Sequence, residues 1–542
     1  MKKTNLFTLF AILVCFFGSI KTSFGGGLNS HLSGTVSGTM TTGNTYYIDG
    51  DILVPSGDTL KIQSGVTVYI TGNYIVFVQG VFLSLGTFYK PNWITVSGVA
   101  KSDNINSGQN PGNDPAYTGY WQGIICDVNC PLLSLKWTHV EFAGLPTSTS
   151  HGSLASGLLY TVYYGNTSGM FIMEDSWIYG CPNDAVRLMG GNVWIARNTF
   201  EKCGYQGGDC VNAKSTTTGD MCYNLFIGTA TNGTKASDKG APTGAVTECN
   251  INMYNNDYIN GGYRNVTPGK GACIDYEQGA EGLAYNNLIV DCKVGLRILS
   301  SPVADTNNCH YGNQFYYIDD TLQGDQIYPT SGPSVTHPET TDIPLPSTYL
   351  PISYTLGSPY YAPGIVGKNN PDFVSYGLPN TNYSAIAYAT GFDFHLQSTS
   401  PCIGKGYTGF KPLAKTATYI PVDSVHGASE ITLPGKDAGC YQHNGSGNQH
   451  GASKLYGGIT PSKLVYDGIS IYPNPATDNL TIISNEMLTK AEYSIIDCFG
   501  KTLTKGRLSG EKTTISVSSL TPGMYFISVN SNEAGYAKFI KE

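Results

Sequence analysis

The chain has 542 residues, which is enough for a large hydrophobic core and at least two domains. Only 13% of the residues are charged, whereas glycine (66) and tyrosine (38) are abundant, and this profile favours a β-rich extracellular protein with many tight turns. The net charge of −8 and the lack of a basic run in the sequence argue against nucleic acid as a partner. We expect a monomer.

The first 25 residues have the pattern of a secretory signal peptide. Lys2 and Lys3 precede the apolar run 6–17, and small residues at 23–25 suit a cleavage site. The apolar run is too short for a membrane-spanning helix, and no later run in the sequence is longer and comparably apolar. We therefore predict that residues 1–25 are removed and that the mature protein does not span a membrane.

Of the 14 cysteines, Cys15 lies in the predicted signal peptide, and the odd remainder leaves at least one free thiol in a monomer. Export permits disulfides, and Cys126–Cys130 and Cys402–Cys440 are plausible pairs, although the spacing does not prove either. The cysteines lack the paired C-x-x-C spacing of zinc sites, so they predict no metal.

An internal repeat organises residues 130–320. Similar segments begin with an asparagine followed by a short apolar strand, and weaker copies begin at Thr138 and Ser176; the asparagine starts are Asn198, Asn224, Asn256, Asn287 and Asn313. Repeats of this length with strands and no helical pattern predict a solenoid, and their variable spacing fits a β-helix with loops of different lengths.

The position two residues after each start is apolar. In stacked rungs, equivalent positions lie about 4.8 Å apart, so these side chains should form one interior row. The predicted row is Val140, Ile178, Phe200, Phe226, Tyr258, Ile289 and Phe315. The asparagines at the starts should form a ladder of amides bonded from rung to rung, which we favour over a ligand-binding role.

Segments at both ends of this region resemble secreted, pectate-lyase-like proteins. Residues 51–70 resemble the opening rungs of right-handed parallel β-helices, and the segments 393–396, 400–406 and 437–441 follow the order of their closing segment. The resemblance implies a right-handed parallel β-helix over residues 26–445. Because Cys402 and Cys440 stand where alanine is usual, it also favours a disulfide between them.

Two stretches do not fit the repeat. Residues 321–390 are rich in Pro, Tyr, Ser and Thr and predict a long irregular insertion in the β-helix. Residues 446–462 contain Gly, Ser and Asn and predict a linker.

Polar residues alternate with apolar ones in the strands after the repeat starts, which predicts that they point away from the core in one ladder across the rungs. Such a row of cations and carboxylates suits an acidic polysaccharide, because cations hold uronate groups and a base removes the proton beside the carboxylate. The catalytic candidates are Arg187, Lys214, Lys235 and Arg297, and the substrate-binding candidates are Asn212, Arg264, Asp275 and Glu277.

Residues 209–215, followed by 223–226 and Lys235, resemble the catalytic strand of the alginate lyase and chondroitinase B group. The resemblance covers about thirty residues and implies a polysaccharide lyase in which Asp209 helps to bind calcium, Lys214 is the base and Lys235 replaces an assisting arginine. The chain departs from the group at Gly207, where a second acid is expected, and at Lys235, where the group has Arg-His.

Three classes of function therefore stay open, and the sequence does not decide whether the chain is an enzyme. A polysaccharide lyase or hydrolase needs a calcium site or paired carboxylates. A carbohydrate-binding surface protein needs only the groove, and a structural adhesin needs neither. The abundance of tyrosine favours sugar contacts through stacking but does not separate the first two classes.

The last eighty residues contain β-forming segments separated by turns, which predicts a small β-sandwich over residues 463–542. Residues 472–476, 520–529 and 538–541 together resemble the type A C-terminal sorting domain of the type IX secretion system of Bacteroidetes. The resemblance implies recognition by that machinery and delivery to the outer-membrane surface or the medium. The predicted fold class is all-β, a β-helix followed by a β-sandwich.

Overall fold

The computed structural model is built almost entirely of β-strands. It describes residues 28–542 except 102–112, 149, 151–153, 155, 206, 240–247, 263–264, 266–269, 299–303, 306–307, 318–369, 377–391, 417–419, 451–468, 485–490, 498–500, 511 and 531–534. The predicted signal peptide lies outside these residues, as do most of the predicted insertion and of the linker. No helix within the described ranges is long and apolar enough to cross a membrane.

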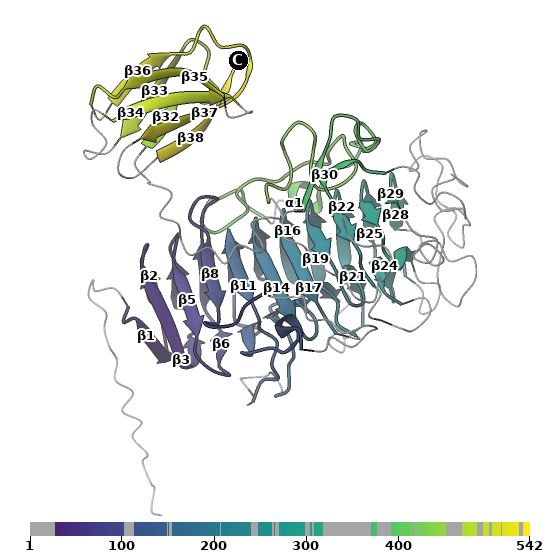
Figure 1. The fold of residues 1–542 in the computed structure, drawn as a ribbon. Coiled ribbons are helices and arrows are strands. Elements are labelled where there is room, and N and C mark those ends of the chain that lie inside the picture. Colours follow the sequence, from purple (N-terminus) through teal and green to yellow (C-terminus); the bar gives the residue numbers. More distant parts are fainter. Residues whose placement is uncertain are drawn as a thin grey trace, which may run out of the picture.

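Three columns of parallel strands form a β-helix, and each rung contributes a strand to columns A, B and C in turn. Figure 1 shows the rungs stacked in chain order, from the purple end to the teal end. Column A contains β2 (Gly38–Met40), β4 (Thr59–Ile62), β7 (Val81–Leu85), β10 (Leu132–Lys136), β13 (Met170–Glu174), β16 (Gly191–Ala196), β19 (Thr217–Cys222), β22 (Asn250–Tyr254), β25 (Gly282–Tyr285) and β28 (Cys309–Gly312).

Columns B and C join at the N-terminal end into one 19-stranded sheet, because β3 (Thr45–Val54) pairs with strands of both columns and with β1 (His31–Thr35). Column B contains β5 (Thr67–Ile70), β8 (Asn92–Thr95), β11 (Thr138–Glu141), β14 (Trp177–Cys181), β17 (Thr199–Cys203), β20 (Leu225–Ile227), β23 (Asp257–Ile259), β26 (Leu288–Val290) and β29 (Phe315–Tyr317). Column C contains β6 (Ile75–Val78), β9 (Gly123–Cys126), β12 (Val162–Tyr164), β15 (Val186–Leu188), β18 (Val211–Lys214), β21 (Thr234–Ser237), β24 (Ala272–Glu277) and β27 (Val294–Ile298).

The predicted interior row is present in column B. In-register pairs connect Val140 to Ile178 and continue through Phe200, Phe226, Tyr258 and Ile289. The ring centroid of Phe226 lies 4.9 Å from that of Phe200 and 4.8 Å from that of Tyr258, close to the strand spacing expected of stacked rungs. These side chains are buried in the main core cluster, so the row holds neighbouring rungs together.

The prediction that Phe315 is the last member of the interior row was wrong by one residue. Ile289 pairs with Tyr316 and not with Phe315. The reason is that Gln314, rather than Asn313, takes the asparagine position of that rung, and its side chain donates a hydrogen bond to the Ala284 carbonyl. Phe315 consequently faces the opposite side of the strand and packs in a separate buried cluster.

The asparagine ladder forms as predicted at the corner between columns A and B. Each asparagine follows a residue in the left-handed backbone region, such as Arg197 (φ 59°) or Tyr223 (φ 56°). Asn224 accepts hydrogen bonds from the backbone and side chain of Asn198, and it donates to Asn256 and to the Ile195 carbonyl. The tight turn leaves backbone groups that cannot pair within the strands, and the buried amides satisfy them.

Substituting Asn224 by alanine should therefore destabilise the coil. Each buried group left without a partner costs about 1–3 kcal/mol, so we expect a clear decrease in the denaturant midpoint. The matched control is Asn192→Ala, because Asn192 is only half-buried on the outer side of column A. A midpoint unchanged by Asn224→Ala would contradict a stabilising role for the ladder.

The predicted Cys402–Cys440 disulfide is not formed. Both residues are buried with free thiols. The Cys402 amide donates to the Ser400 hydroxyl, and the Cys440 amide donates to the carboxylate of Asp257. The Ala438 amide also donates to the Cys402 carbonyl, so backbone hydrogen bonding joins the two parts of the closing segment without a bridge.

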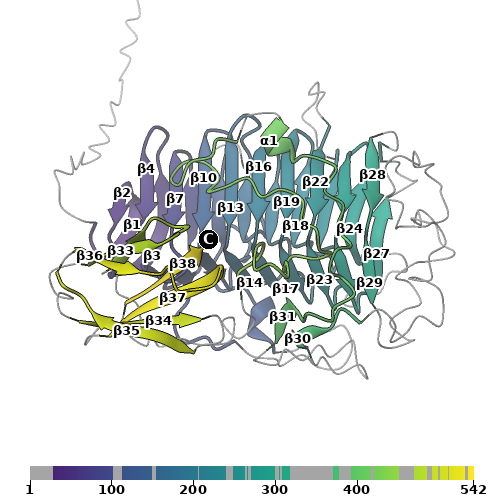
Figure 2. The same cartoon turned by 90° about the horizontal axis from the view of Figure 1, so that it is seen from above.

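Residues 405–416 and 420–450 form a strap that packs along the coil, as the green segment in Figure 2 shows. Its α1 (Leu413–Thr416) lies against column A, where Asp220 accepts hydrogen bonds from the Leu413 and Ala414 amides. Farther back, Lys136 donates to the Asp423 carbonyl and Glu174 accepts from the Ser429 amide. Before the strap, β30 (Phe373–Ser375) pairs antiparallel with β31 (Asp393–Leu396).

The C-terminal residues form a small antiparallel β-sandwich, as predicted. One sheet contains β32 (Ile469–Tyr472), β33 (Asn479–Ser484) and β36 (Lys512–Ser516), and the other contains β34 (Glu492–Asp497), β35 (Thr502–Arg507), β37 (Gly523–Asn530) and β38 (Gly535–Lys541). Leu480, Ile495 and Phe539 belong to one buried cluster that joins the two sheets.

Candidate functional site

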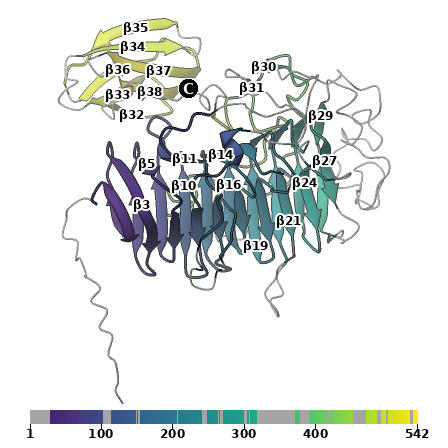
Figure 3. The same ribbon diagram turned by 60° about the horizontal axis from the view of Figure 1, so that its bottom comes forward.

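The polar row is the set of residues Arg187, Asn212, Lys235, Asp275 and Arg297 on column C. In-register pairing places each beside the next on five successive rungs. Its C-terminal half lies on β21, β24 and β27, which follow one another in the teal part of the coil (Figure 3). The alternation of polar and apolar residues in the sequence thus predicted a ladder that the structure contains.

Lys214 and Glu277 lie beside this row rather than in it. Lys214 pairs with Ser237, and Ser237 pairs with Glu277. The two candidates therefore lie on the same face as the polar row, but two residues farther along β18 and β24. Arg264, the remaining substrate-binding candidate, lies outside the described residues.

The polar row is outward of the core but largely covered. Asp275 is 0% exposed and Arg297 is 1% exposed, while Lys235 and Arg187 retain 15% and 22% of their side-chain surface. Part of the cover comes from the turns that precede the strands, because Asp184, Asp209 and Asn232 direct their side chains onto the row.

These three turn residues form a second ladder. The Asp209 amide donates to Asp184, the Asn232 amide donates to Asp209, and the Ala272 amide donates to Asn232. Sequence reasoning missed Asp184 and Asn232. The signal was present, because Asp184, Asp209 and Asn232 each stand three residues before a member of the polar row.

The C-terminal half of the row is an ion-pair network. The Arg297 guanidinium lies 2.6 Å from the Asp275 carboxylate, and the Lys235 ammonium lies 2.8 Å from Glu277 and 3.8 Å from Asp275. Burial alone would raise the pKa of Asp275, but Arg297 and Lys235 lower it below its ordinary value. Burial likewise opposes the charge of Lys235, yet the carboxylates Asp275, Asp209 and Glu277 raise its pKa. These charges stabilise one another.

The N-terminal half of the row differs, because it contains polar groups without partners. The Oδ1 atom of Asn212 and the Nε atom of Arg187 are buried and accept or donate no hydrogen bond. Lys214 is only 3% exposed, and its ammonium forms no hydrogen bond or ion pair with any described residue. Burial, together with the charges of Lys235 and Arg187, lowers the pKa of Lys214 to about 8.

Two tyrosines adjoin this half of the site. Tyr163 on β12 is the in-register neighbour of Arg187, and its ring lies 5.8 Å from the ring of Tyr160. The Arg187 guanidinium lies over Tyr160 at 5.6 Å from the ring centroid, a distance at which cation–π attraction operates. Both tyrosines are partly exposed, so the row is flanked by an accessible aromatic edge.

The role of Asp209 as a calcium ligand stays a prediction. One of its carboxylate oxygens accepts hydrogen bonds from Asn232 and the other accepts from Asn212, so both are already engaged. Burial and the neighbouring Asp184 raise its pKa to about 7. A carboxyl group in this environment is a poor fit to a calcium site, and we assign no chemical step to the ion.

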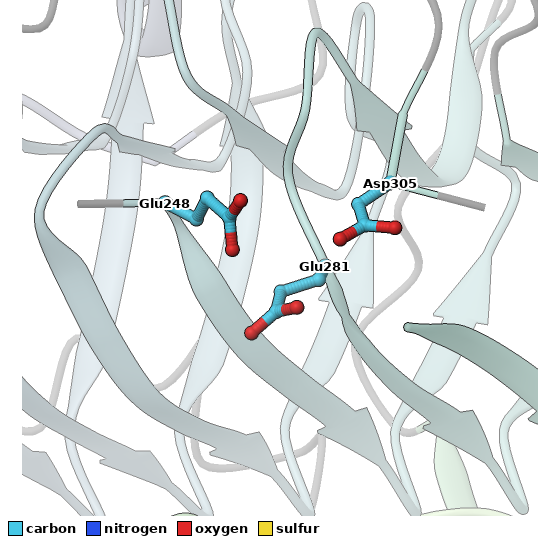
Figure 4. Close-up of side chains that lie close together, drawn as sticks. All are labelled: Glu248, Glu281 and Asp305. Atoms are coloured by element: carbon cyan, nitrogen blue, oxygen red, sulfur yellow. The ribbon is translucent and has the colours of Figure 1, made fainter. Parts of the chain in front are cut away.

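Among the described residues, a cluster of three carboxylates away from the polar row has a spacing that could suit a metal ion. Glu248, Glu281 and Asp305 bring one carboxylate oxygen each to within 4.8 Å of the others, as Figure 4 shows. Burial raises the pKa of Glu281, and the negative charges of Glu248 and Asp305 raise it further. Exposed acidic clusters also occur without metal ions, and we assign no ion to these three residues.

Comparison with known proteins identifies the C-terminal domain. Residues 470–542 match the family described as the secretion system C-terminal sorting domain. No curated protein and no solved structure matches the chain at a significant level. The fold and this match define a secreted parallel β-helix protein with a type IX sorting domain. It interacts with the type IX secretion machinery and is delivered to the cell surface or the extracellular space.

Proposed function

We propose that this protein binds acidic polysaccharides outside the cell and cleaves them by β-elimination, with Lys214 as the general base. The observation that carries the proposal is a pair of buried atoms without hydrogen-bond partners, Arg187 Nε and Asn212 Oδ1, on the face that also holds the buried Lys214. Buried polar groups are normally paired, so unpaired ones beside each other mark a place where a polar ligand completes the hydrogen bonding. The relation to pectate-lyase-like enzymes is part of the same proposal.

The chemistry of a uronate residue matches these groups. Arg187 neutralises the sugar carboxylate, which makes the proton on the adjacent carbon more acidic. The neutral amine of Lys214 takes that proton, and the electron pair of the broken carbon–hydrogen bond forms a carbon–carbon double bond. The bond from the next carbon to the glycosidic oxygen breaks, its electron pair stays on the oxygen, and this oxygen takes up a proton from water. The ion pairs of Lys235, Asp275 and Arg297 hold the adjoining rungs in position.

A second candidate is a non-catalytic surface protein that binds carbohydrate or acts as an adhesin. The complete burial of Asp275 and Arg297 and their close ion pair favour it, because such networks also occur where they only hold strands together. Under this alternative, the tyrosine edge beside Arg187 would contact sugar without any cleavage.

Assays of the exported protein against a panel of uronic-acid polymers separate the two candidates. A lyase generates unsaturated products that absorb ultraviolet light, whereas a binding protein is retained on the polymer and generates none. The assay with and without a chelator tests calcium dependence. Retention on no acidic polymer, together with the lack of unsaturated products, would contradict the lyase and the carbohydrate-binding protein and would leave the adhesin.

The rate of cleavage should rise with pH. The base must be the neutral amine, and the pKa of Lys214 is lowered to about 8, so its neutral fraction increases as the pH passes through this value. The measurement is kcat/KM between about pH 6.5 and about pH 9.5 on the best polymer of the panel. A rate that falls over this interval would exclude Lys214 as the base.

A further inference from the structure

Lys202 and Asp114 form an ion pair that is completely enclosed and lies away from the polar row. The Nζ atom of Lys202 lies 2.7 Å from the Oδ2 atom of Asp114, and both side chains are 0% exposed. Lys202 lies near the end of β17, whereas Asp114 directly precedes a short 3-10 helix, η1 (Pro115–Tyr117). The fold therefore brings an amine and a carboxyl group, 88 residues apart in the chain, into direct contact without solvent.

Close packing holds Asp114 in this position. The helix η1 packs against β14 and β17, and Ala116 belongs to a buried cluster with Phe142 and Tyr179. Gly180 of β14 lies so near the helix that an added Cβ atom would stand 2.7 Å from the Cα atom of Ala116. Because the backbone beside Asp114 is fixed against the coil, its carboxyl group stays in contact with the lysine.

We propose that Lys202 and Asp114 condense in the folded protein into an amide between their side chains, an isopeptide bond. The Nζ atom attacks Cγ of Asp114 and forms a nitrogen–carbon bond, and the bond from Cγ to Oδ2 breaks. Of the three ammonium protons, two leave with Oδ2 as water and one stays on the amide nitrogen. The step needs no oxidant and no other reactant. This modification is independent of the function proposed for the polar row.

Three features of the contact favour the reaction. The Ala116 amide donates a 3.0 Å hydrogen bond to Oδ1 of Asp114, so it stabilises the negative charge that develops on this oxygen during the attack. Fixed and well-oriented groups react as though one were present at roughly 10⁵–10⁸ M. The neutral amide also removes two charges whose burial is costly.

Peptide mapping of the exported protein tests the proposal. Trypsin does not cleave after a lysine whose amine is in an amide, so Lys202 should stay inside the peptide 198–214. The partner peptide is 102–136, which contains Asp114. After denaturation, reduction and alkylation, we expect one branched product with the summed mass of the two peptides less one water. Unlinked peptide 102–136, together with complete cleavage after Lys202, would overturn the proposal.

Two controls separate the amide from an ion pair. In Lys202→Arg a positive charge stays beside Asp114, but the guanidinium is not deprotonated, so we expect the unlinked peptide 102–136. Lys235 lies 2.8 Å from Glu277, but both side chains retain some exposure, 15% and 9%. Trypsin should therefore cleave after Lys235 in the same digest. A branched product in Lys202→Arg would contradict the assignment of the nucleophile.

The folded state should be required for the condensation. Protein recovered from inclusion bodies and kept in denaturant lacks the enclosed contact, so its digest should contain the separate peptides. The branched product should appear after the same sample is refolded, and it should persist when the refolded protein is denatured again. Linkage in a chain that has never folded would show that the enclosed contact does not drive the reaction and would overturn the proposal.

Discussion

Replacing Lys214 by alanine is expected to abolish polymer cleavage while the coil stays folded. A positioned general base contributes roughly 10²–10⁴-fold to the rate, and the lysine in the adjacent polar row, Lys235, is already paired with Glu277. The Lys214 ammonium makes no hydrogen bond or ion pair with a described residue that the fold would lose, so the unfolding midpoint should change little or rise. The measurement is the initial rate of formation of unsaturated product.

Two further variants serve as controls for the Lys214→Ala experiment. Lys214→Arg keeps a positive charge that cannot be deprotonated, so it should retain binding but not cleavage. Lys61→Ala, on β4 of column A, removes a lysine away from column C and should leave the rate unchanged. Wild-type activity in Lys214→Ala would exclude the proposed base. Weaker retention of Lys214→Ala on the polymer, together with no unsaturated product from the wild-type protein, would favour the non-catalytic alternative.

Deleting residues 463–542 is expected to leave the protein in the periplasm of a host with the type IX system. The deleted segment contains the matched sorting domain, and its strands form their own sandwich with a separate core. The β-helix should therefore fold without it. Cell fractionation and surface labelling measure the outcome.

The reciprocal experiment attaches residues 463–542 to a periplasmic reporter, which should then reach the surface. The matched control carries the same segment with the deletion of β37 and β38, because this removes two adjacent strands of one sheet of the sandwich. Surface display of the protein truncated at residue 462 would contradict the function of the sorting domain.

The sequence was most informative where one residue type recurs at equivalent positions. The asparagine starts predicted both the solenoid and the amide ladder, because a short turn with buried backbone groups needs an amide at the same place in every rung. The same pattern failed at the last rung. Gln314 can make the bond of an asparagine, so the visible Asn313 indicated the wrong register there.

The site was predicted in its composition but not in its pairing. Alternation placed Arg187, Lys235 and Arg297 on one face, and the structure confirms that they share a ladder. It did not distinguish the cations that are neutralised from those that are not. This depends on which carboxylate lies on the adjacent rung, and therefore on loop lengths that no periodicity encodes.

By itself, the sequence determined the fold class, the interior row and the sorting domain, because these depend on local alternation and on repeated residues. Only the tertiary structure decided that Asp184 and Asn232 cover the site, that Cys402 and Cys440 are free thiols, and that Lys214 is buried. These features depend on contacts between residues far apart in the chain. The physical reason is that burial and charge pairing are set by distances across neighbouring rungs, and those distances exist only once the coil is stacked.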